Sequence, residues 1–282
     1  MAEVSIHIRQ LNPGDLPFCH RLVAEAGWNQ TDADWSRAME LEPTGCFIAE
    51  KGHTPVATTT TCCFGSIAWI AMVLVDKRFR NQGIARQLLE HAIAYLESRK
   101  IATIRLDATS LGQGLYEKLG FEDEYEVIRF RREALLDNHV LAETSSRQLI
   151  EDIAGLDRQA TKTGREALLS ALRIQGSPIL CKYRKNGQVE AYATGRPGTY
   201  AFQIGPVISA MPESALELLA RMSAQYQSER VFIDIPSANV QSISWAEASG
   251  FVKQRSFIRM YRGQKIEDLV QSIWACFGPE KG

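Results

Sequence analysis

Apolar residues recur along this chain with two spacings, one helical and one alternating. The helical spacing is clearest after Gly83, where one face of a predicted helix carries Ile84, Leu88, Leu89, Ala92, Ile93 and Leu96. Short alternating or continuous apolar runs between turn residues predict strands. In the first half the predicted strands are 4–9, 46–50, 56–63, 68–75, 103–107 and 124–131, and the predicted helices are 16–26, 31–41, 83–99 and 112–119. This mixture of helices and strands predicts an α/β (α+β) fold.

The second half repeats this plan. Its predicted helices are 146–160, 165–174, 213–227 and one that ends before Gly250, and its predicted strands are 139–143, 179–183, 189–194, 200–208 and 231–235. Positions 130 residues apart also match, since Glu117 pairs with Glu247, Gly120-Phe121 with Gly250-Phe251, and Ile128-Arg129 with Ile258-Arg259. Repeats in register indicate a duplication. We therefore predict two domains, at residues 1–135 and 136–282.

Composition narrows the functional classes. The 282 residues are 45% hydrophobic and 23% charged, with a net charge of −1, which is typical of a soluble globular protein and argues against a general nucleic-acid binder. The first residues lack the basic and apolar pattern of a signal peptide, and the longest apolar run, near residues 67–75, is too short to span a bilayer. We expect a cytoplasmic protein with no nucleic-acid or membrane partner.

Cysteine and histidine spacing gives no sign of a metal centre. The six cysteines are scattered without a C-x-x-C pair, and the five histidines form no H-E-x-x-H cluster. Scattered cysteines in a chain of this length are typical of reduced thiols. We therefore expect no metal, and we interpret Cys62-Cys63 as strand packing rather than as a nucleophile.

A basic turn between a predicted strand and a predicted helix carries the candidate binding chemistry. The turn contains Arg80, Asn81, Gln82, Gly83, Ile84 and Ala85. A helix N-terminus presents unpaired N–H groups and a positive dipole end, and a glycine there lets the backbone approach a ligand closely. The turn therefore predicts a phosphate or pyrophosphate site. It has neither the G-x-x-x-x-G-K-S/T run of a P-loop nor the G-x-G-x-x-G run of a dinucleotide-binding turn.

Two motifs in this order resemble the GNAT superfamily of N-acetyltransferases. The run Arg80-x-x-Gly83-x-Ala85 is similar to that family's acetyl-CoA pyrophosphate motif, and residues 115–121 are similar to its Leu-Tyr-x-x-x-Gly-Phe segment. The resemblance covers residues 1–133 and implies a mixed, mostly antiparallel sheet flanked by helices. It implies that acetyl-CoA binds to backbone groups of Val73, Leu74 and Val75 and to the turn from Arg80 to Ala85. Thr109 occupies a place where many members carry an asparagine that contacts CoA.

The same resemblance makes Tyr116 the candidate general acid, because a phenol can protonate a departing thiolate. The alternative is a helix tyrosine that only packs its ring. The general base stays open between Asp107, beside the expected cleft, and a relay of waters, while Asp76 is interpreted as a turn residue. Trp28 and Asn29 are candidates for the acceptor pocket, although Trp28 also fits a core position.

The second half lacks the basic turn. Its equivalent segment, residues 205–212, has no basic side chain and ends in Pro212, which has no N–H to offer. Ala246 stands where the offset places Tyr116. We expect a degenerate GNAT-like domain that packs on the first and helps to wall the acceptor site.

Together these features predict an acetyl-CoA-dependent N-acetyltransferase. The resemblance implies direct transfer of the acetyl group to a primary amine of a small molecule or a protein, by a monomer or homodimer. Two alternatives remain open. One is a non-catalytic sensor of acetyl-CoA or another metabolite, and the other is an interaction protein whose second half recruits a partner.

Overall fold

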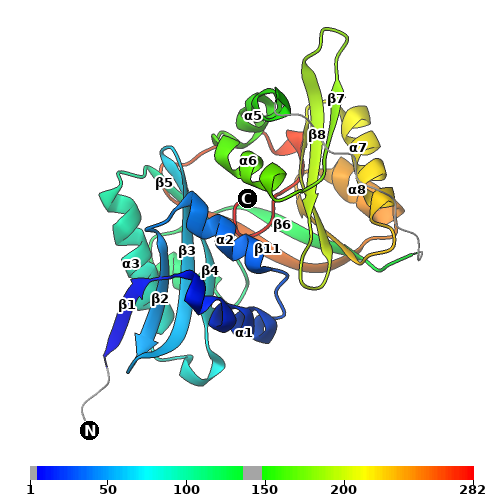
Figure 1. Cartoon of the computed structure of the whole chain (residues 1–282). Coiled ribbons are helices and arrows are strands. Elements are labelled where there is room, and N and C mark those ends of the chain that lie inside the picture. Colours follow the sequence, from blue (N-terminus) through cyan, green and yellow to red (C-terminus); the bar gives the residue numbers. More distant parts are fainter. Residues whose placement is uncertain (1–4, 136–147) are drawn as a thin grey trace.

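The computed structural model describes residues 5–135 and 148–282, which form one long twisted sheet with helices on both faces (Figure 1). In these residues twelve strands, mostly antiparallel, are accompanied by eight α-helices. The strand expected at residues 139–143 lies outside the described residues. The predicted fold class, a mixed sheet flanked by helices in two similar halves, is confirmed.

The first half follows the predicted order, and each element ends within two residues of its expected bounds. Its helices are α1 (Leu16–Ala26), α2 (Asp32–Leu41), α3 (Ile84–Ser98) and α4 (Gln113–Lys118). Its strands are β1 (Ile6–Gln10), β2 (Cys46–Lys51), β3 (Thr54–Phe64), β4 (Ile67–Val75), β5 (Thr103–Ala108) and β6 (Glu122–Arg132).

The second half repeats these elements and has two strands that were not predicted. Its helices are α5 (Gln148–Thr161), α6 (Glu166–Ile174), α7 (Pro212–Gln225) and α8 (Val240–Ala248). Its strands are β7 (Ile179–Tyr183), β8 (Val189–Arg196), β9 (Phe202–Ser209), β10 (Val231–Pro236) and β11 (Val252–Gly263). The last strand is β12 (Ile273–Ala275), and β11 and β12 are the two that were not predicted.

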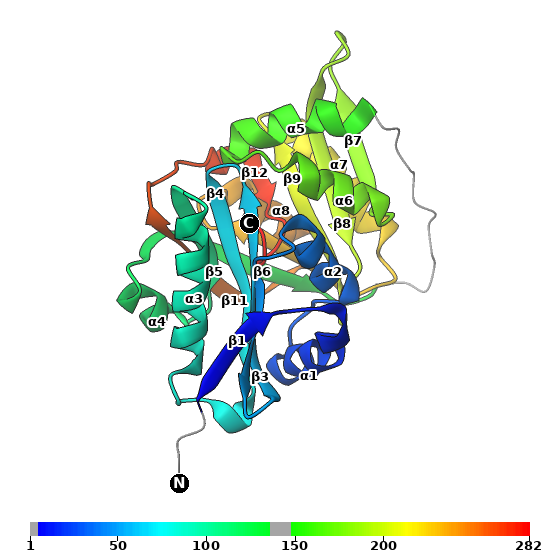
Figure 2. The same ribbon diagram turned by 60° about the vertical axis from the view of Figure 1, so that its left-hand side comes forward.

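Different helices cover the two faces of the first-half sheet. α3 packs its predicted apolar stripe on one face, and all six residues of that stripe are buried. On the other face Leu22 of α1 and Trp35 of α2 pack against β3 and β4. Leu168 and Leu172 of α6 join this same cluster. The two halves therefore share a core, and Figure 2 shows α2 and α6 next to each other there.

The two halves exchange one strand each, β6 and β11. The sheet order is β1-β2-β3-β4-β5-β11-β6-β10-β9-β8-β7, so β11 lies between β5 and β6, and β6 pairs with β10. β11 is antiparallel to both neighbours, with Ile258 opposite Ala108 of β5 and Glu126 of β6. In Figure 1 the green β6 and the brown β11 cross between the halves. The sheet of each half is therefore completed by a strand from the other.

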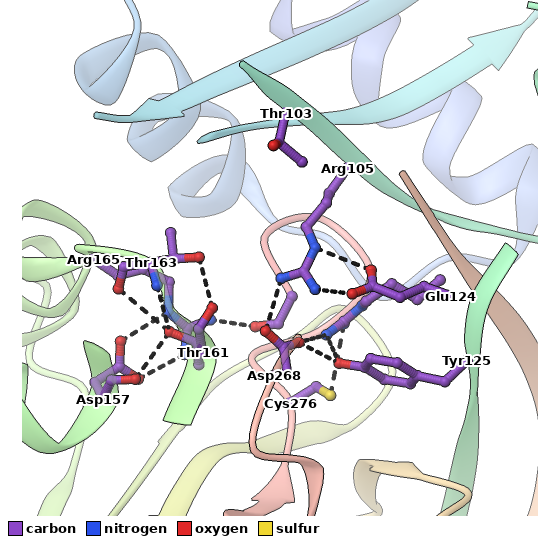
Figure 3. Close-up of polar contacts among 12 residues, drawn as sticks. Thr103, Arg105, Glu124, Tyr125, Asp157, Thr161, Thr163, Arg165, Asp268 and Cys276 are labelled. Atoms are coloured by element: carbon purple, nitrogen blue, oxygen red, sulfur yellow. Dashed lines mark hydrogen bonds and ion pairs between the residues drawn. The ribbon is translucent and has the colours of Figure 1, made fainter. Parts of the chain in front are cut away.

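Buried ion pairs fix the strands at this joint. Arg259 of β11 donates to both carboxylate oxygens of Asp107 of β5, at 2.8 and 2.9 Å. Figure 3 shows Arg105 of β5 reaching Glu124 of β6 and Asp268, which lies beyond β11. All five side chains are almost fully buried. Since a buried charge that loses its partner costs several kcal/mol, these pairs favour one arrangement of β5, β11 and β6.

Candidate functional site

A cavity opens where two neighbouring strands of the first half separate. β4 and β5 pair in parallel only at Ile67–Trp69 and Thr103–Arg105, and they diverge beyond these residues. A cavity of about 820 Å³ is lined by both strands at the separation and extends to residues of the second half. Where the two strands diverge, their backbone N–H and C=O groups no longer pair with each other. These groups can instead form hydrogen bonds with a ligand.

The turn before α3 forms part of the cavity wall. Asn81 and Gly83 adopt left-handed backbone conformations, with φ of 61° and 76°, and no side chain caps the first turn of α3. The first N–H groups of this 15-residue helix are therefore free for an anion. A Cβ at Gly83 would have no protein atom within 4 Å, so the backbone here is open to a ligand.

Nine of the ten residues predicted to hold the cofactor line this cavity. They are Val73, Leu74, Val75, Arg80, Asn81, Gly83, Ile84, Ala85 and Thr109. Gln82 is the exception, because its exposed side chain accepts a hydrogen bond from Lys51 Nζ at 2.9 Å. The contiguous turn is therefore assembled as expected, with the Gln82 side chain directed to a neighbouring strand.

A bulge in β4 lies beside the cavity. Met72 has φ of 52°, and the pairing of β3 with β4 shifts register between Thr58 and Thr60. Thr58 Oγ1 donates to the Met72 carbonyl at 2.9 Å and so holds the bulge. Because a bulge re-aims the backbone that follows it, this one sets the direction of the Val73 and Leu74 peptide groups in the cavity wall.

Tyr116, the candidate acid, lies in the cavity wall on α4. Its ring packs edge-on against Phe121, with the centroids 5.9 Å apart, so the packing alternative describes the ring. Its hydroxyl has no hydrogen-bond partner among the residues that the structure describes. Burial raises the pKa of this phenol to about 12, so it keeps its proton at neutral pH.

Neither carboxylate considered for the base is free. Asp107 lines the cavity but gives both oxygens to Arg259. Asp76 accepts from the Arg78 N–H at the start of a short turn, and it pairs with Arg78 and Arg21 at 2.8 Å. These hydrogen bonds, Arg78 first, hold the pKa of Asp76 well below its usual range. Asp76 is thus a turn residue, as predicted, and Asp107 is an ion-pair partner.

On the side of α1 and α2, two residues of the cavity wall each carry a buried oxygen without a partner in the described part of the chain. Glu25 Oε1 accepts from Arg21 at 2.8 Å, while its buried Oε2 has no hydrogen bond within the described residues. Gln30 is 4% exposed, its Nε2 donates to Glu280 at 3.3 Å, and its Oε1 is also without a partner there. Sequence reasoning missed both residues, and their only signal was their closeness to Trp28 in the chain.

Of the two acceptor candidates, Trp28 lines the cavity and also packs, partly buried, against the core cluster of α1 and α2, and Asn29 is structural. Asn29 Oδ1 accepts from the backbone N–H groups of Tyr200 and Ala201, at 2.9 and 3.0 Å. Its Nδ2 donates to the Ala201 carbonyl at 2.9 Å. Asn29 therefore ties the loop between α1 and α2 to the second half and positions Trp28 and Gln30 beside it.

The exchanged strands and the last residues of the chain complete the cavity wall. β11 contributes Arg255 and Phe257, β6 contributes Arg129, and residues beyond β12 contribute Pro279 and Glu280. Glu280 is 2% exposed and pairs with Arg196. The second half therefore helps to wall the cavity of the first.

The second half has an equivalent strand separation, but β12 fills it. β9 and β10 pair in parallel only at residues 202–204 and 231–233. β12 then pairs with β9, and the Cys276 N–H donates to the Asp234 carbonyl of β10 at 2.8 Å. A Cβ on Gly205 would lie 1.9 Å from the Cys276 carbonyl oxygen, so this close approach requires glycine. The chain itself thus occupies the place that corresponds to the first-half cavity.

Metal and membrane features are not found in the described ranges. Within residues 5–135 and 148–282 no group of three His, Cys, Asp or Glu side chains could hold a metal ion. No helix in that part of the chain is long and apolar enough to cross a bilayer. Burial raises the pKa of the Cys63 thiol to about 12, which disfavours the nucleophilic thiolate and agrees with strand packing.

Comparison with protein families gives two matches in tandem. Models described as "Acetyltransferase (GNAT) domain" match residues 42–123 and residues 153–275. The first match contains the strand separation, the turn before α3 and Tyr116. The second runs from α5 to β12.

Similar proteins extend over most of the chain. The Bacillus subtilis (strain 168) protein named "Uncharacterized N-acetyltransferase YitH" is 27% identical over 226 residues, which are 77% of this chain and 77% of that protein. A candidate acetyltransferase from Pyrococcus horikoshii has a TM-score of 0.85 at 24% identity, covering 98% of this chain and 96% of its own. A tandem GNAT protein from the clavulanic acid biosynthesis pathway has a TM-score of 0.65 at 12% identity, covering 94% and 100%. These two structures share the fold.

Proposed function

Because this chain belongs to the GNAT acetyltransferase superfamily, with two GNAT domains in tandem, we propose that its first-half cavity is the active site of an acetyl-CoA-dependent N-acetyltransferase. The acetyl group passes directly to a primary amine. One observation carries this proposal. A single cavity of about 820 Å³ combines a helix N-terminus open to an anion, a protonated phenol and two unpartnered oxygens.

The residues of the wall fit acetyl-CoA. The free N–H groups at the start of α3 suit a pyrophosphate, and Arg80 adds positive charge beside them. The backbone from Val73 to Val75 suits an extended pantetheine chain, because β5 has diverged from it there. When bound, acetyl-CoA supplies the acetyl group as an activated thioester.

Tyr116 is the acid of this proposal. Its pKa of about 12 keeps the phenol protonated, and it can give that proton to the departing thiolate sulfur. A backbone N–H that follows the Met72 bulge can stabilise negative charge on the acyl oxygen, as oxyanion donors do. These two groups act on the leaving sulfur and on the carbonyl, respectively.

Glu25 and Gln30 hold the acceptor amine. Amine N–H groups would satisfy Glu25 Oε2 and Gln30 Oε1, each of which otherwise costs about 1–3 kcal/mol as an unpaired buried acceptor. Since arginines engage both Asp107 and Asp76, we assign removal of the amine proton to water in the cavity.

Calorimetric titration with acetyl-CoA tests the proposal. The wild-type protein should bind one acetyl-CoA per chain, because β12 fills the second-half cleft. Gly83→Glu should weaken binding by at least about 100-fold, since it places a carboxylate at the anion turn. Gly65→Glu is the matched control, because Gly65 also has positive φ (66°) and open space around its Cβ but lies outside the cavity wall.

A screen of primary amines by mass spectrometry should then detect an acetylated product. The absence of acetyl-CoA binding by the wild-type protein would refute the proposal. Equal binding by wild type and Gly83→Glu would refute the assignment of the turn.

A further inference from the structure

Arg255 is a cavity arginine without a partner. Four arginines line the cavity, and the other three are engaged: Arg86 with Glu90 at 2.8 Å, Arg129 with Asp234 at 2.7 Å, and Arg80 with the Val75 carbonyl at 3.2 Å. Within residues 5–135 and 148–282, Arg255 makes neither an ion pair nor a hydrogen bond. Its guanidinium is therefore free to bind a ligand.

The surroundings of Arg255 favour an anion. The side chain is half-buried, and it stands opposite Arg129 in the pairing of β11 with β6. Burial, and then the like charge of Arg129, lower the pKa of the Arg255 guanidinium, while the nearby charge of Asp234 acts in the opposite direction. A bound anion would offset the first two effects. The planar guanidinium offers paired N–H donors that match a carboxylate, so a bidentate contact is available.

The direction of Arg255 separates it from the anion turn of α3. Side chains along β11 alternate, and Ile258 and Met260 face the cluster that contains α3. Arg259 points to the opposite face, where it meets Asp107 and lies over the Trp69 ring. Residues 255, 257 and 259 share that face, which α1 and α2 also cover.

The same side of the cavity holds the two oxygens assigned above to the amine. Glu25 belongs to α1, and Gln30 follows it in the loop before α2. On this side of the wall, among the described residues, the oxygens of Glu25 and Gln30 lack hydrogen-bond donors, and the Arg255 guanidinium lacks an ion-pair partner. Trp28 and Phe257 supply apolar surface to the same wall.

We propose that the acceptor is a small amino carboxylate, with its amine on Glu25 and Gln30 and its carboxylate on Arg255. This inference rests on the proposed acetyltransferase function and names the substrate class of that site. Arg255 is then a specificity-determining residue, supplied to the first-half site by a strand of the second half. Simple amines of the same shape lack the group that Arg255 binds.

Steady-state kinetics with matched acceptors tests the inference. The pairs are L-alanine and ethylamine, L-lysine and cadaverine, L-histidine and histamine, and L-tyrosine and tyramine. For at least one pair the wild-type protein should prefer the amino acid in kcat/KM by at least about 10-fold, as a charged hydrogen bond supplies. Arg255→Gln should lower kcat/KM for that amino acid by about 10- to 100-fold, mainly through KM, and leave the amine unchanged.

Two further variants isolate the guanidinium. Lys253→Gln removes a positive charge from the same strand at an exposed position outside the cavity, where Lys253 pairs with Glu126 at 3.7 Å. It should leave the preference for the amino acid intact. Arg255→Lys keeps the charge but loses the paired donors, and it should restore part of the preference.

Acetyl-CoA affinity is measured in every variant and separates the outcomes. A wild-type protein that binds acetyl-CoA but treats both members of every pair alike, or acetylates none of them, overturns the amino carboxylate and leaves the proposed function standing. Loss of acetyl-CoA affinity in Arg255→Gln overturns the inference by placing Arg255 at the cofactor. Absence of acetyl-CoA binding by the wild type instead refutes the proposed function, and this inference with it.

Discussion

Individual polar groups in this cavity divide into those with partners and those without. Asp107 and Asp76 are held by arginines, so their oxygens are engaged before any ligand arrives. The Tyr116 hydroxyl, Glu25 Oε2 and the Arg255 guanidinium have no partner within the described residues. Because folding alone leaves these groups unsatisfied, they are the ones that a substrate would complete.

Tyr116→Phe tests the acid. It removes the hydroxyl, retains the ring that packs on Phe121, and should lower kcat by about 100- to 10,000-fold. Affinity for acetyl-CoA should not change in the same calorimetric assay. Tyr200→Phe, at a 43% exposed position outside the cavity wall, should leave kcat unchanged.

The pH dependence follows from the same pKa. Since burial raises the pKa of Tyr116 to about 12, the acid form persists from neutral pH to near pH 12, and its ionisation should lower activity only close to pH 12 and above. A wild-type rate that fell with a pKa near 10 and lost that limb in Tyr116→Phe would contradict the burial of the phenol. A chain with bound acetyl-CoA and no turnover at all would instead favour the sensor.

Sequence reasoning located the residues that are contiguous in the chain. The turn from Arg80 to Ala85 and the segment around Tyr116 are local motifs, and local conformation brings their groups together. Glu25 and Arg255 were missed because they become candidate binding residues only when segments far apart in the sequence come together in the fold. The pairing of Asp107 with Arg259 has the same origin, because it joins residues more than 150 positions apart.

Among the elements, periodicity predicted the helices and strands that bury one apolar face. The stripe of α3 is the clearest case, and its bounds differ from those expected by one residue at each end. β12 was missed because a strand of three residues is too short to show an alternating hydrophobic pattern. Its position depends on the gap between β9 and β10. The need for glycine at position 205 is visible only in the structure, where the Cys276 carbonyl lies against it.

Trp274→Ala tests whether β12 is an integral part of the second-half core. Trp274 is 1% exposed, packs in the cluster that contains α7 and α8, and donates from Nε1 to the Ser209 carbonyl at 3.1 Å. Its loss should lower the free energy of unfolding by about 3–5 kcal/mol, measured by urea denaturation. Leu269→Ala, at a 48% exposed position just before β12, should change it by less than about 0.5 kcal/mol. A change below 1 kcal/mol for Trp274→Ala would contradict this packing.

For the whole molecule, the exchange of β6 and β11 was not predictable from the repeat. The two strands match position by position, as Ile128-Arg129 and Ile258-Arg259 show, so either strand suits either half. In the observed arrangement Arg259 pairs with Asp107 and Arg129 pairs with Asp234, so each arginine meets an aspartate of the other half. The duplication was thus readable in the sequence, whereas the sharing of strands between its copies was not.

The exchange predicts that the two halves unfold together. Removing either half would strip a central strand from the sheet of the other, so neither half is a separate cooperative unit. Differential scanning calorimetry of the full 282-residue chain should show one transition with an enthalpy of about 200 kcal/mol, equal to its van't Hoff enthalpy. Independent halves would give two transitions, each with roughly half of that van't Hoff enthalpy.

Core substitutions in each half sharpen this test. Leu89 of α3 and Leu218 of α7 are both fully buried, in separate clusters on the two halves, and each change to alanine should cost about 2–5 kcal/mol. If the exchanged strands couple the halves, each variant shifts the entire transition to lower temperature without splitting it. A variant that moved only part of the heat absorption would mean that its half melts alone, and the strand exchange would then not hold the two halves in one cooperative unit.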